Sequence, residues 1–386
     1  SQASPIIFCS AETGARSTRP LRRASRSSSA AWNRCAEVSS AEITVMIVSD
    51  KRNYAFFTLA IIAGIFSIYA YALQLGDGTK EDSLVFKKVM DDVKDVSLFS
   101  YNTFAVKNDG TLWGTGLNVQ GWLGLDRPLK IHSFVKLMDG VKSVSGTQVI
   151  KEDGTLWIID STPKKVDDNV IKVSGRFYIK SDLSLWIRGR EHYGEFGDGM
   201  QDSVYAKPFK IMDSIIDVCD CGVYSMIVTA ENVLMVAGAH YLPSPFKRPS
   251  YEFIKAAERV SGILDGFYIT TDGSLYAFGF SAEGGLGVGD IKNDILPTKI
   301  MDKVKFVSGA QICSFIITQD NSLYGCGGRS PNYFGALGTG SLSPELYPVF
   351  IMKNVKTAVA GSFHSAIIKE DGTLWTCGAN DEHGVM

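Results

Sequence analysis

Short apolar runs alternate with polar turns along residues 84–386, and one short sequence marks each repeat. An acidic residue and a turn residue are followed by Leu and an aromatic residue in six copies, and a seventh, degenerate copy ends in Leu-Met. Asp-Gly between two apolar runs is a strong hairpin signal, because tight turns need residues with positive φ. The pattern predicts seven hairpins, at Asp109–Trp113, Asp153–Trp157, Asp182–Trp186, Glu231–Met235, Asp272–Tyr276, Asp320–Tyr324 and Asp371–Trp375.

Each hairpin belongs to a longer unit of four predicted strands. The runs before the turn, such as Phe104–Val106, are continuously apolar, which is typical of a strand buried on both faces. After the Leu-aromatic pair come a Gly-rich loop, a strand such as Phe134–Met138 and a valine strand such as Val141–Val144. Successive Leu positions lie 29 to 51 residues apart. Four short strands at this period predict a β-propeller blade, and a solenoid is the alternative architecture.

The two ends of the repeat region complement each other. Phe86–Met90 matches Phe134–Met138 but precedes the first unit, whereas the last unit lacks such a strand. We therefore expect strand 84–90 to complete the last blade and to lock the ring. The second unit lacks a Gly-rich loop after Trp157, so the propeller should be least regular near residues 141–190. The predicted fold is all-β, a seven-bladed propeller of four-stranded blades over residues 84–386.

The residues before the repeat are of a different kind. Residues 1–45 contain six Arg and no Lys and show no apolar periodicity, which predicts a disordered leader or sequence foreign to the natural protein. An organelle transit peptide is the alternative for this stretch. At 46–72, a basic start, an apolar run and Ala-Tyr-Ala predict a signal peptide cleaved after Ala72. An uncleaved membrane anchor, one hydrophobic helix through residues 54–75, is the rival.

Composition and charge narrow the functional classes. Hydrophobic residues at 45% and charged residues at 21% exclude a mainly disordered chain, and 38 Gly fit a chain rich in tight turns. The net charge of the whole chain is −2, but residues 73–386 hold 31 basic and 37 acidic residues, a net charge of −6. Neither nucleic acid nor an anionic membrane surface is an expected partner of such a domain. Because of the segment at 46–72, we expect it to be extracytoplasmic: secreted, periplasmic or membrane-anchored.

The last unit resembles a known repeat. Residues 361–380 read Gly-Ser-Phe-His-Ser-Ala-Ile-Ile-Lys-Glu-Asp-Gly-Thr-Leu-Trp-Thr-Cys-Gly-Ala-Asn, which is similar to the repeat of the regulator of chromosome condensation family, a seven-bladed propeller. The resemblance extends over residues 84–386. The His-Ser pair of that repeat is kept here only as His364-Ser365. The resemblance implies a structural role for His364.

The resemblance also implies protein partners. The founding member of the family is an exchange factor for a small Ran-type GTPase, and a secreted branch inhibits β-lactamases by capping them with loops on one face. We therefore favour a non-catalytic, monomeric scaffold that binds an unknown protein or peptide, such as a cell-surface or secreted enzyme. Guanine-nucleotide exchange on a small GTPase is one alternative, and glycan binding or glycan cleavage is another.

The candidate binding residues are ring-bearing side chains of the Gly-rich loops. The hairpins and strands do not need them for packing, and exposed aromatic residues are typical anchors of interfaces. The alternative is that these rings pack beneath their own loops. The candidates are Trp122, His192, Tyr193, Phe196, Tyr333, Phe334 and His383.

The sequence contains no recognisable catalytic, metal or cofactor motif. Its five His residues lack metal-type spacing, and Gly284–Gly289 lies in a predicted blade turn with no helix after it to bind phosphate. The acidic pairs Asp91-Asp92 and Asp167-Asp168 are interpreted as solvated turn residues. We therefore expect no catalytic residue, no metal and no cofactor.

The cysteines do not predict a disulfide framework. Five follow residue 72, an odd number. Cys326 and Cys377 precede a Gly in equivalent positions of two units and are interpreted as small buried apolar residues. Cys219 and Cys221 form a single close pair without the further ligands that structural zinc needs.

Overall fold

The computed structural model describes residues 75–118, 121–125, 130–238, 250–279, 281, 284–291, 295–309, 313–328, 335–361 and 363–380. The leader predicted at 1–45 and the signal peptide or anchor predicted at 46–72 lie outside these ranges. Among the residues that are described, no helix is long and apolar enough to cross a membrane.

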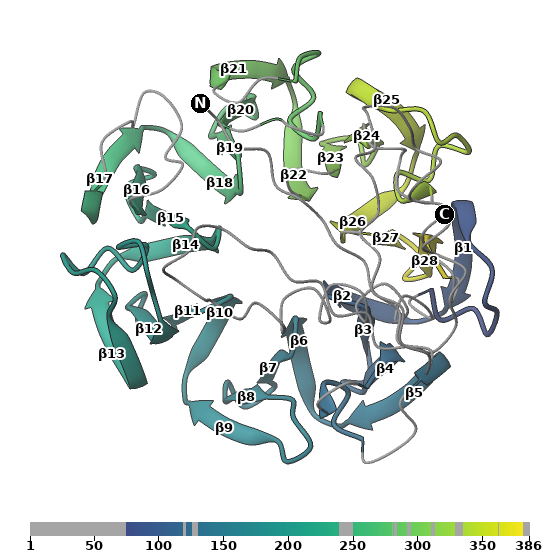
Figure 1. Cartoon of the computed structure of the whole chain (residues 1–386), viewed down its shortest axis with the longest axis horizontal. Coiled ribbons are helices and arrows are strands. Elements are labelled where there is room, and N and C mark those ends of the chain that lie inside the picture. The colour runs from purple at the N-terminus through teal and green to yellow at the C-terminus, as the bar shows by residue number, and fades with distance from the viewer. Residues whose placement is uncertain are drawn as a thin grey trace, which may run out of the picture. The chain divides into compact units, whose positions relative to one another are not determined.

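The described residues form seven antiparallel sheets of four strands each, arranged in a ring (Figure 1). The predicted all-β, seven-bladed propeller is confirmed. In each blade, the strand nearest the centre of the ring begins with a buried Val or Ile, which packs between neighbouring sheets. These innermost strands are β2 (Val93–Phe99), β6 (Val141–Ser145), β10 (Val170–Ser174), β14 (Ile215–Asp220), β18 (Val260–Leu264), β22 (Val304–Gly309) and β26 (Val355–Ala360).

The second and third strands of each blade form the predicted hairpin. The apolar second strands are buried almost throughout, because both of their faces meet other blades. They are β3 (Asn102–Lys107), β7 (Gln148–Lys151), β11 (Phe177–Lys180), β15 (Tyr224–Thr229), β19 (Phe267–Thr270), β23 (Cys313–Thr318) and β27 (His364–Lys369). The third strands all begin with a buried Leu and are β4 (Leu112–Leu117), β8 (Leu156–Ile158), β12 (Leu185–Arg190), β16 (Leu234–Gly238), β20 (Leu275–Gly279), β24 (Leu323–Gly327) and β28 (Leu374–Gly378).

The outermost strands lie at the rim of the ring, and one of them comes from the other end of the chain. β1 pairs antiparallel with β28, with Lys88 opposite Trp375 and Met90 opposite Leu374. The predicted closure of the ring is thus confirmed. The outermost strands are β5 (Lys130–Met138), β9 (Lys164–Asp167), β13 (Val204–Met212), β17 (Ser250–Ala257), β21 (Ile295–Met301), β25 (Glu345–Met352) and β1 (Ser83–Met90). Blades 1 to 6 are β2–β5, β6–β9, β10–β13, β14–β17, β18–β21 and β22–β25, and blade 7 is β26–β28 with β1.

Hydrogen bonds within the turn explain the repeated pentapeptide. In blade 1 the Asp109 carboxylate accepts hydrogen bonds from the backbone N–H of Thr111 at 2.9 Å and from its hydroxyl at 2.7 Å. The Trp113 indole donates to the same hydroxyl at 2.8 Å. Three other turns repeat the Asp–Thr/Ser–Trp arrangement. The hydroxyl residue thus joins the turn to the aromatic ring of the following strand.

The positive-φ residue of each turn also joins its blade to the next. Gly110, at φ +82°, directs its carbonyl to the backbone N–H of Val141, the first residue of the next innermost strand, at 2.8 Å. The same bond recurs in all seven blades, and the bond from Val93 to Gly372 closes the ring at 2.8 Å. The left-handed conformation therefore serves both the hairpin and the contact between blades.

We expect Gly154→Ala to lower the free energy of unfolding by about 1 kcal/mol, because a residue with a Cβ is strained in the left-handed region. A Cβ at position 154 would meet nothing closer than 3.7 Å, so the strain would come from φ +79° alone. Gly262→Ala is the matched control, since its new Cβ would have similar room, at 3.8 Å, without a positive φ. Urea unfolding of both variants should show destabilisation of the first only, and equal effects would contradict the explanation.

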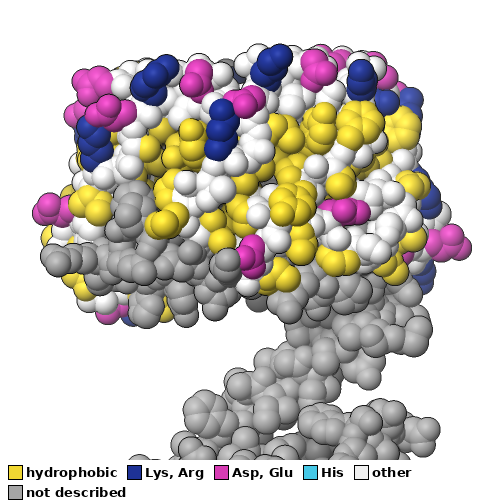
Figure 2. All heavy atoms as spheres, turned by 90° about the horizontal axis from the view of Figure 1, so that it is seen from above, with side chains coloured by type: hydrophobic (Ala, Val, Ile, Leu, Met, Phe, Trp, Pro, Cys, Tyr) yellow, Lys and Arg dark blue, Asp and Glu magenta, His cyan; other side chains and the backbone are white. Residues whose placement is uncertain are grey.

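Charged pairs surround the face of the propeller opposite the Gly-rich loops. At the turn that leads into the next innermost strand, Lys88 and Asp91 are 2.6 Å apart, and five equivalent pairs follow in other blades. Figure 2 shows Lys or Arg and Asp or Glu side chains along one edge of the molecule, next to a band with many hydrophobic side chains. Such exposed pairs each contribute at most about 1 kcal/mol, so they keep this face solvated more than they stabilise it.

The Gly-rich loops fasten neighbouring blades through one short motif. Four described segments have the sequence Leu/Phe-Gly-x-Gly, and each buries its first side chain. The N–H of the second Gly donates to a carbonyl of the next outermost strand, as in Gly199 to Tyr251 at 2.8 Å. We call these segments plug loops; they are 75–78, 196–199, 286–289 and 337–340.

The first plug loop precedes the repeats and completes the closure of the ring. The Leu75 carbonyl accepts from the Thr376 hydroxyl of blade 7 at 2.9 Å, and Gly78 donates to the His132 carbonyl of blade 1 at 3.1 Å. The Leu75 side chain is fully buried. Residues 75–78 therefore belong to the propeller.

Blade 2 is the least regular, as predicted. Its strands β8 and β9 contain only three and four residues, and residues 159–163 alone connect them. This connection does not contain the Leu/Phe-Gly-x-Gly sequence of a plug loop.

Candidate functional site

The predicted binding residues that the structure describes lie in two separate loops. Trp122 follows β4 in blade 1 and is half-buried, with its ring edge against Phe99 at 5.5 Å between centroids. His192, Tyr193 and Phe196 share the loop between β12 and β13 in blade 3. Tyr333, Phe334 and His383 lie outside the described residues.

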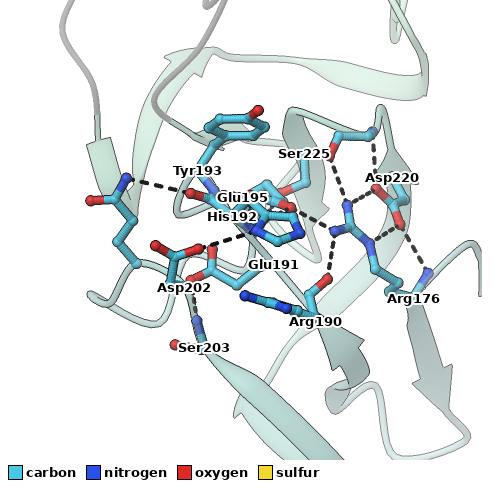
Figure 3. Close-up of polar contacts among 12 residues, drawn as sticks. Arg176, Arg190, Glu191, His192, Tyr193, Glu195, Asp202, Ser203, Asp220 and Ser225 are labelled. Atoms are coloured by element: carbon cyan, nitrogen blue, oxygen red, sulfur yellow. Dashed lines mark hydrogen bonds and ion pairs between the residues drawn. The ribbon is translucent and has the colours of Figure 1, made fainter. Parts of the chain in front are cut away.

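His192 and Tyr193 lie side by side at the surface of the blade 3 loop (Figure 3). Their ring centroids are 6.1 Å apart, and the His192 side chain is 51% exposed. Its Nδ1 lies 3.1 Å from an oxygen of Asp202. These two residues are the predicted candidates that the structure brings together at the surface.

The expectation that Phe196 presents an exposed ring is wrong. Its side chain is fully buried and is the apolar residue of the plug loop 196–199. Phe177 packs edge-on against it at 5.6 Å, and Tyr205 lies 6.0 Å away. Phe196 therefore supports the loop from beneath.

Arg176 lies beneath this loop and connects several of its polar groups. The sequence did not identify it as a site residue. Its guanidinium donates to both oxygens of Asp220 in blade 4, at 2.8 and 2.6 Å, and to Glu195 at 2.6 Å. It also donates to the backbone carbonyls of Arg190 and Gly222, each at 3.0 Å (Figure 3). Burial alone would lower the pKa of Arg176, but the two carboxylates outweigh it and raise that pKa.

The buried Glu195 carboxylate holds the exposed end of the loop in place. It accepts the backbone N–H of His192 at 3.2 Å and that of Tyr193 at 2.7 Å, while it also binds Arg176. The hydroxyl of Ser225 in blade 4 donates to the Glu195 carbonyl at 2.5 Å. The loop backbone at His192 and Tyr193 is therefore held by bonds that involve two blades.

Glu191 is a second buried carboxylate in the same loop. One oxygen accepts the Ser203 N–H at 3.0 Å, and the other has no hydrogen-bond partner among the residues that the structure describes. Burial raises the pKa of Glu191, and the charges of Glu195 and Asp198 add to this effect. Its described bond ties the start of the loop to its end.

Other acidic side chains link strands or blades. Asp167 was expected to be a solvated turn residue, but it lies in β9 and accepts from the Tyr178 hydroxyl at 2.6 Å and from Lys180 at 2.8 Å. Asp95, in an innermost strand, accepts the N–H of Val144 from the next blade at 2.9 Å. These carboxylates are engaged in structural bonds.

The five described cysteines are free. Cys326 and Cys377 are fully buried between blades, as predicted. The sulfur atoms of Cys219 and Cys221 are 3.5 Å apart in blade 4. Within the described ranges, no group of three or more His, Cys, Asp or Glu is placed to hold a metal ion.

His364 occupies a structural position, as the resemblance implied. Its Nε2 lies 2.9 Å from the Thr103 hydroxyl, which links blade 7 to blade 1, and its ring is fully buried. Burial lowers the pKa of His364 to about 3, so the ring is neutral at physiological pH.

Acidification should weaken the propeller through this ring. In the unfolded chain His364 takes up a proton near pH 6.5, whereas the folded protein resists protonation down to about pH 3. The stabilisation is complete above pH 6.5 and is lost as the pH falls, at about 1.4 kcal/mol per pH unit. Between pH 7.5 and 5, wild type should therefore lose about 2 kcal/mol more than His364→Gln in urea unfolding. Equal losses in both proteins would contradict this.

Comparison with known proteins finds a matching family model and solved structures with a similar fold. Residues 355–384 match the model of the Regulator of chromosome condensation (RCC1) repeat. The matched segment includes the three strands β26, β27 and β28 of blade 7. Solved structures with a similar fold include human WBSCR16, at a TM-score of 0.61 and 14% identity over 76% of this chain and 88% of that one. Yeast RCC1 (Prp20) bound to Kap60 matches at a TM-score of 0.60 and 14% identity over 86% of this chain and 96% of that one.

Three curated relatives match parts of the chain. The guanine nucleotide exchange factor SRM1 of Saccharomyces cerevisiae is 24% identical over 295 residues, 72% of this chain and 55% of the relative. The ultraviolet-B receptor UVR8 of Arabidopsis thaliana is 28% identical over 147 residues, 36% of this chain and 32% of the relative. The X-linked retinitis pigmentosa GTPase regulator of the dog is 31% identical over 120 residues, 30% and 12% of the two chains. The matched region thus spans between about an eighth and about half of the relatives' lengths.

Proposed function

We propose that this RCC1-type propeller is a non-catalytic scaffold that binds a protein or peptide through the loop side of blade 3. The observation that supports this is the surface loop with His192 and Tyr193, whose backbone N–H groups are held by Glu195, which in turn binds Arg176. A loop backbone that is already ordered loses little conformational entropy on binding, and its ring-bearing side chains are suited to anchor an interface.

Affinity capture with the full chain from an extract of the source organism tests this function. The bait is compared with His192→Ala/Tyr193→Ala and with Tyr347→Ala, which removes an exposed ring from the rim of blade 6. A specific partner should be lost with the double variant and retained with the control. Partners that bind all three baits equally would refute a role for the blade 3 loop.

Guanine-nucleotide exchange is the second candidate, because the similarity to SRM1 covers 72% of the chain. A small GTPase loaded with a fluorescent guanine nucleotide should then release it faster in the presence of the propeller. A release rate that stays at the intrinsic value, with representative GTPases of the source organism, would remove this candidate.

We further propose that residues 46–72 direct the propeller out of the cytoplasm. The basic start, the apolar run and the Ala-Tyr-Ala site support this proposal. Cell fractionation should find the full-length protein or its processed form in the medium, the periplasm or the membrane, and a variant that lacks residues 46–72 in the cytoplasm. Recovery of both proteins from the cytoplasm would overturn the proposal.

A further inference from the structure

The contact between blades 2 and 3 lacks a plug loop that four other contacts have. Plug loops lie between blades 3 and 4, 5 and 6, 6 and 7, and 7 and 1. The short connection 159–163 leaves no such segment in blade 2. A cavity of about 540 Å³ is present instead. Cavities of this size hold ordinary ligands and side chains of partner proteins.

The walls of the cavity match what a plug loop contacts elsewhere. Leu156, Ile158 and Val166 of blade 2 face Tyr178 and Tyr205 of blade 3 across it. In the occupied contacts, the buried Leu or Phe of the plug loop packs against comparable apolar side chains, as Leu337 does among Phe86, Phe315 and Cys377. An apolar side chain would therefore find equivalent surroundings here.

The outermost strand of blade 3 also has the equivalent hydrogen-bond position. In four outermost strands, one residue pairs with the first Leu of the third strand, and the carbonyl that accepts from a plug loop belongs to the residue six positions before it. In β1, for example, Met90 is the paired residue and Leu84 provides the accepting carbonyl. In β13 the paired residue is Met212, which places the equivalent acceptor at Ala206. Ala206 lines the cavity.

The mouth of the cavity is basic. Arg188 and Arg190 line it, both are exposed, and neither forms an ion pair with another described residue. Arg176 also lines it but is already held by Asp220 and Glu195. Free guanidinium groups bind carboxylates strongly and often with two hydrogen bonds. Although residues 73–386 are acidic overall, this opening favours a negatively charged ligand.

We propose that the cavity between blades 2 and 3 is a vacant plug-loop socket that binds an acidic peptide segment of a partner protein. One Leu or Phe side chain enters the cavity, a backbone N–H donates to the Ala206 carbonyl, and flanking carboxylates bind Arg188 and Arg190. The segment supplies in trans the contact that plug loops make in cis elsewhere in the ring. This inference rests on the proposed function of the propeller as a binding scaffold and assigns a second contact site and its chemistry.

Fluorescence anisotropy with the full-length chain tests the proposal. The probe is the fluorescein-labelled heptapeptide Glu-Asp-Leu-Gly-Asp-Gly-Glu. We expect saturable binding, at least tenfold weaker binding when Leu is replaced by Ser, and none when every acidic residue is replaced by Lys. Absence of saturable binding up to about millimolar protein, or equal binding of the Lys peptide, would overturn the proposal.

Variants of the protein locate the binding. Arg188→Gln/Arg190→Gln should weaken the probe about tenfold or more, and Ala206→Trp should abolish binding by filling the socket. Lys87→Gln/Lys353→Gln removes the same charge from exposed positions elsewhere and should bind as wild type does. Equal affinity of wild type and the Arg double variant would refute the site, even if Ala206→Trp did not fold. Because the probe is a defined peptide and His192 and Tyr193 stay intact, its result is independent of the capture experiment above.

Discussion

Replacing Arg176 with Leu should lower the free energy of unfolding by about 3–5 kcal/mol, because it leaves two buried carboxylates without a counter-charge. The Glu195 side chain is 1% exposed and that of Asp220 is 7% exposed. In the unfolded chain both are hydrated, so the whole penalty falls on the folded state. Urea unfolding followed by tryptophan fluorescence measures the change.

Two controls distinguish this explanation from a simple loss of packing. Lys88→Leu removes an exposed ion pair with Asp91 and should cost less than about 1 kcal/mol. Adding Glu195→Gln and Asp220→Asn to Arg176→Leu should restore part of the stability, since the remaining groups are uncharged. If the triple variant is as unstable as the sum of its single changes, the charges are not the cause.

Phe86→Ala should destabilise the propeller by about 3–5 kcal/mol, the range for removing a buried aromatic ring. Phe86 lies in β1, is 6% exposed and packs against Phe315 of blade 6 at 6.0 Å. It therefore attaches the strand that closes the ring to the neighbouring blade as well as to its own. Thermal or urea unfolding gives the magnitude.

Limited proteolysis adds a local test of the same substitution. Because the ring is closed through β1, the variant should be cut first between β1 and β2, before the other blades open. Phe350→Ala in β25 is the control, since that ring is 52% exposed and its loss should cost about 1 kcal/mol or less. Similar losses of stability in both variants would contradict a special role for the closing strand.

The fold could be predicted because its determinants are local and repeated. The Asp-Gly-Thr-Leu-Trp turn is specified by hydrogen bonds within five residues, as Asp109, Thr111 and Trp113 show. The closing strand was recognisable because Phe86–Met90 repeats the pattern of Phe134–Met138. The first residue of the propeller was harder to predict, because Leu75 continues the apolar run that precedes it.

The site was harder to predict because its contacts cross blades. Arg176 meets Asp220 44 residues away, and the number of residues from one blade to the next varies between 29 and 51. Phe196 was misjudged although a signal existed: it occupies the position of Leu286 and Leu337 in the plug loops, where the side chain is always buried. Alignment of the loops by their glycines would have separated it from His192 and Tyr193.

The pairing of β1 with β28 has a consequence for biosynthesis. Ser83 pairs with Gly378, so β1, which is synthesised before the other blades, can pair only after β28 has been synthesised. During that interval β1 is an unpaired edge strand that carries Leu84 and Val85, which remain exposed even in the finished ring. Such an edge can pair with another nascent chain. The yield of folded protein should therefore depend on how quickly translation delivers the C-terminal blade.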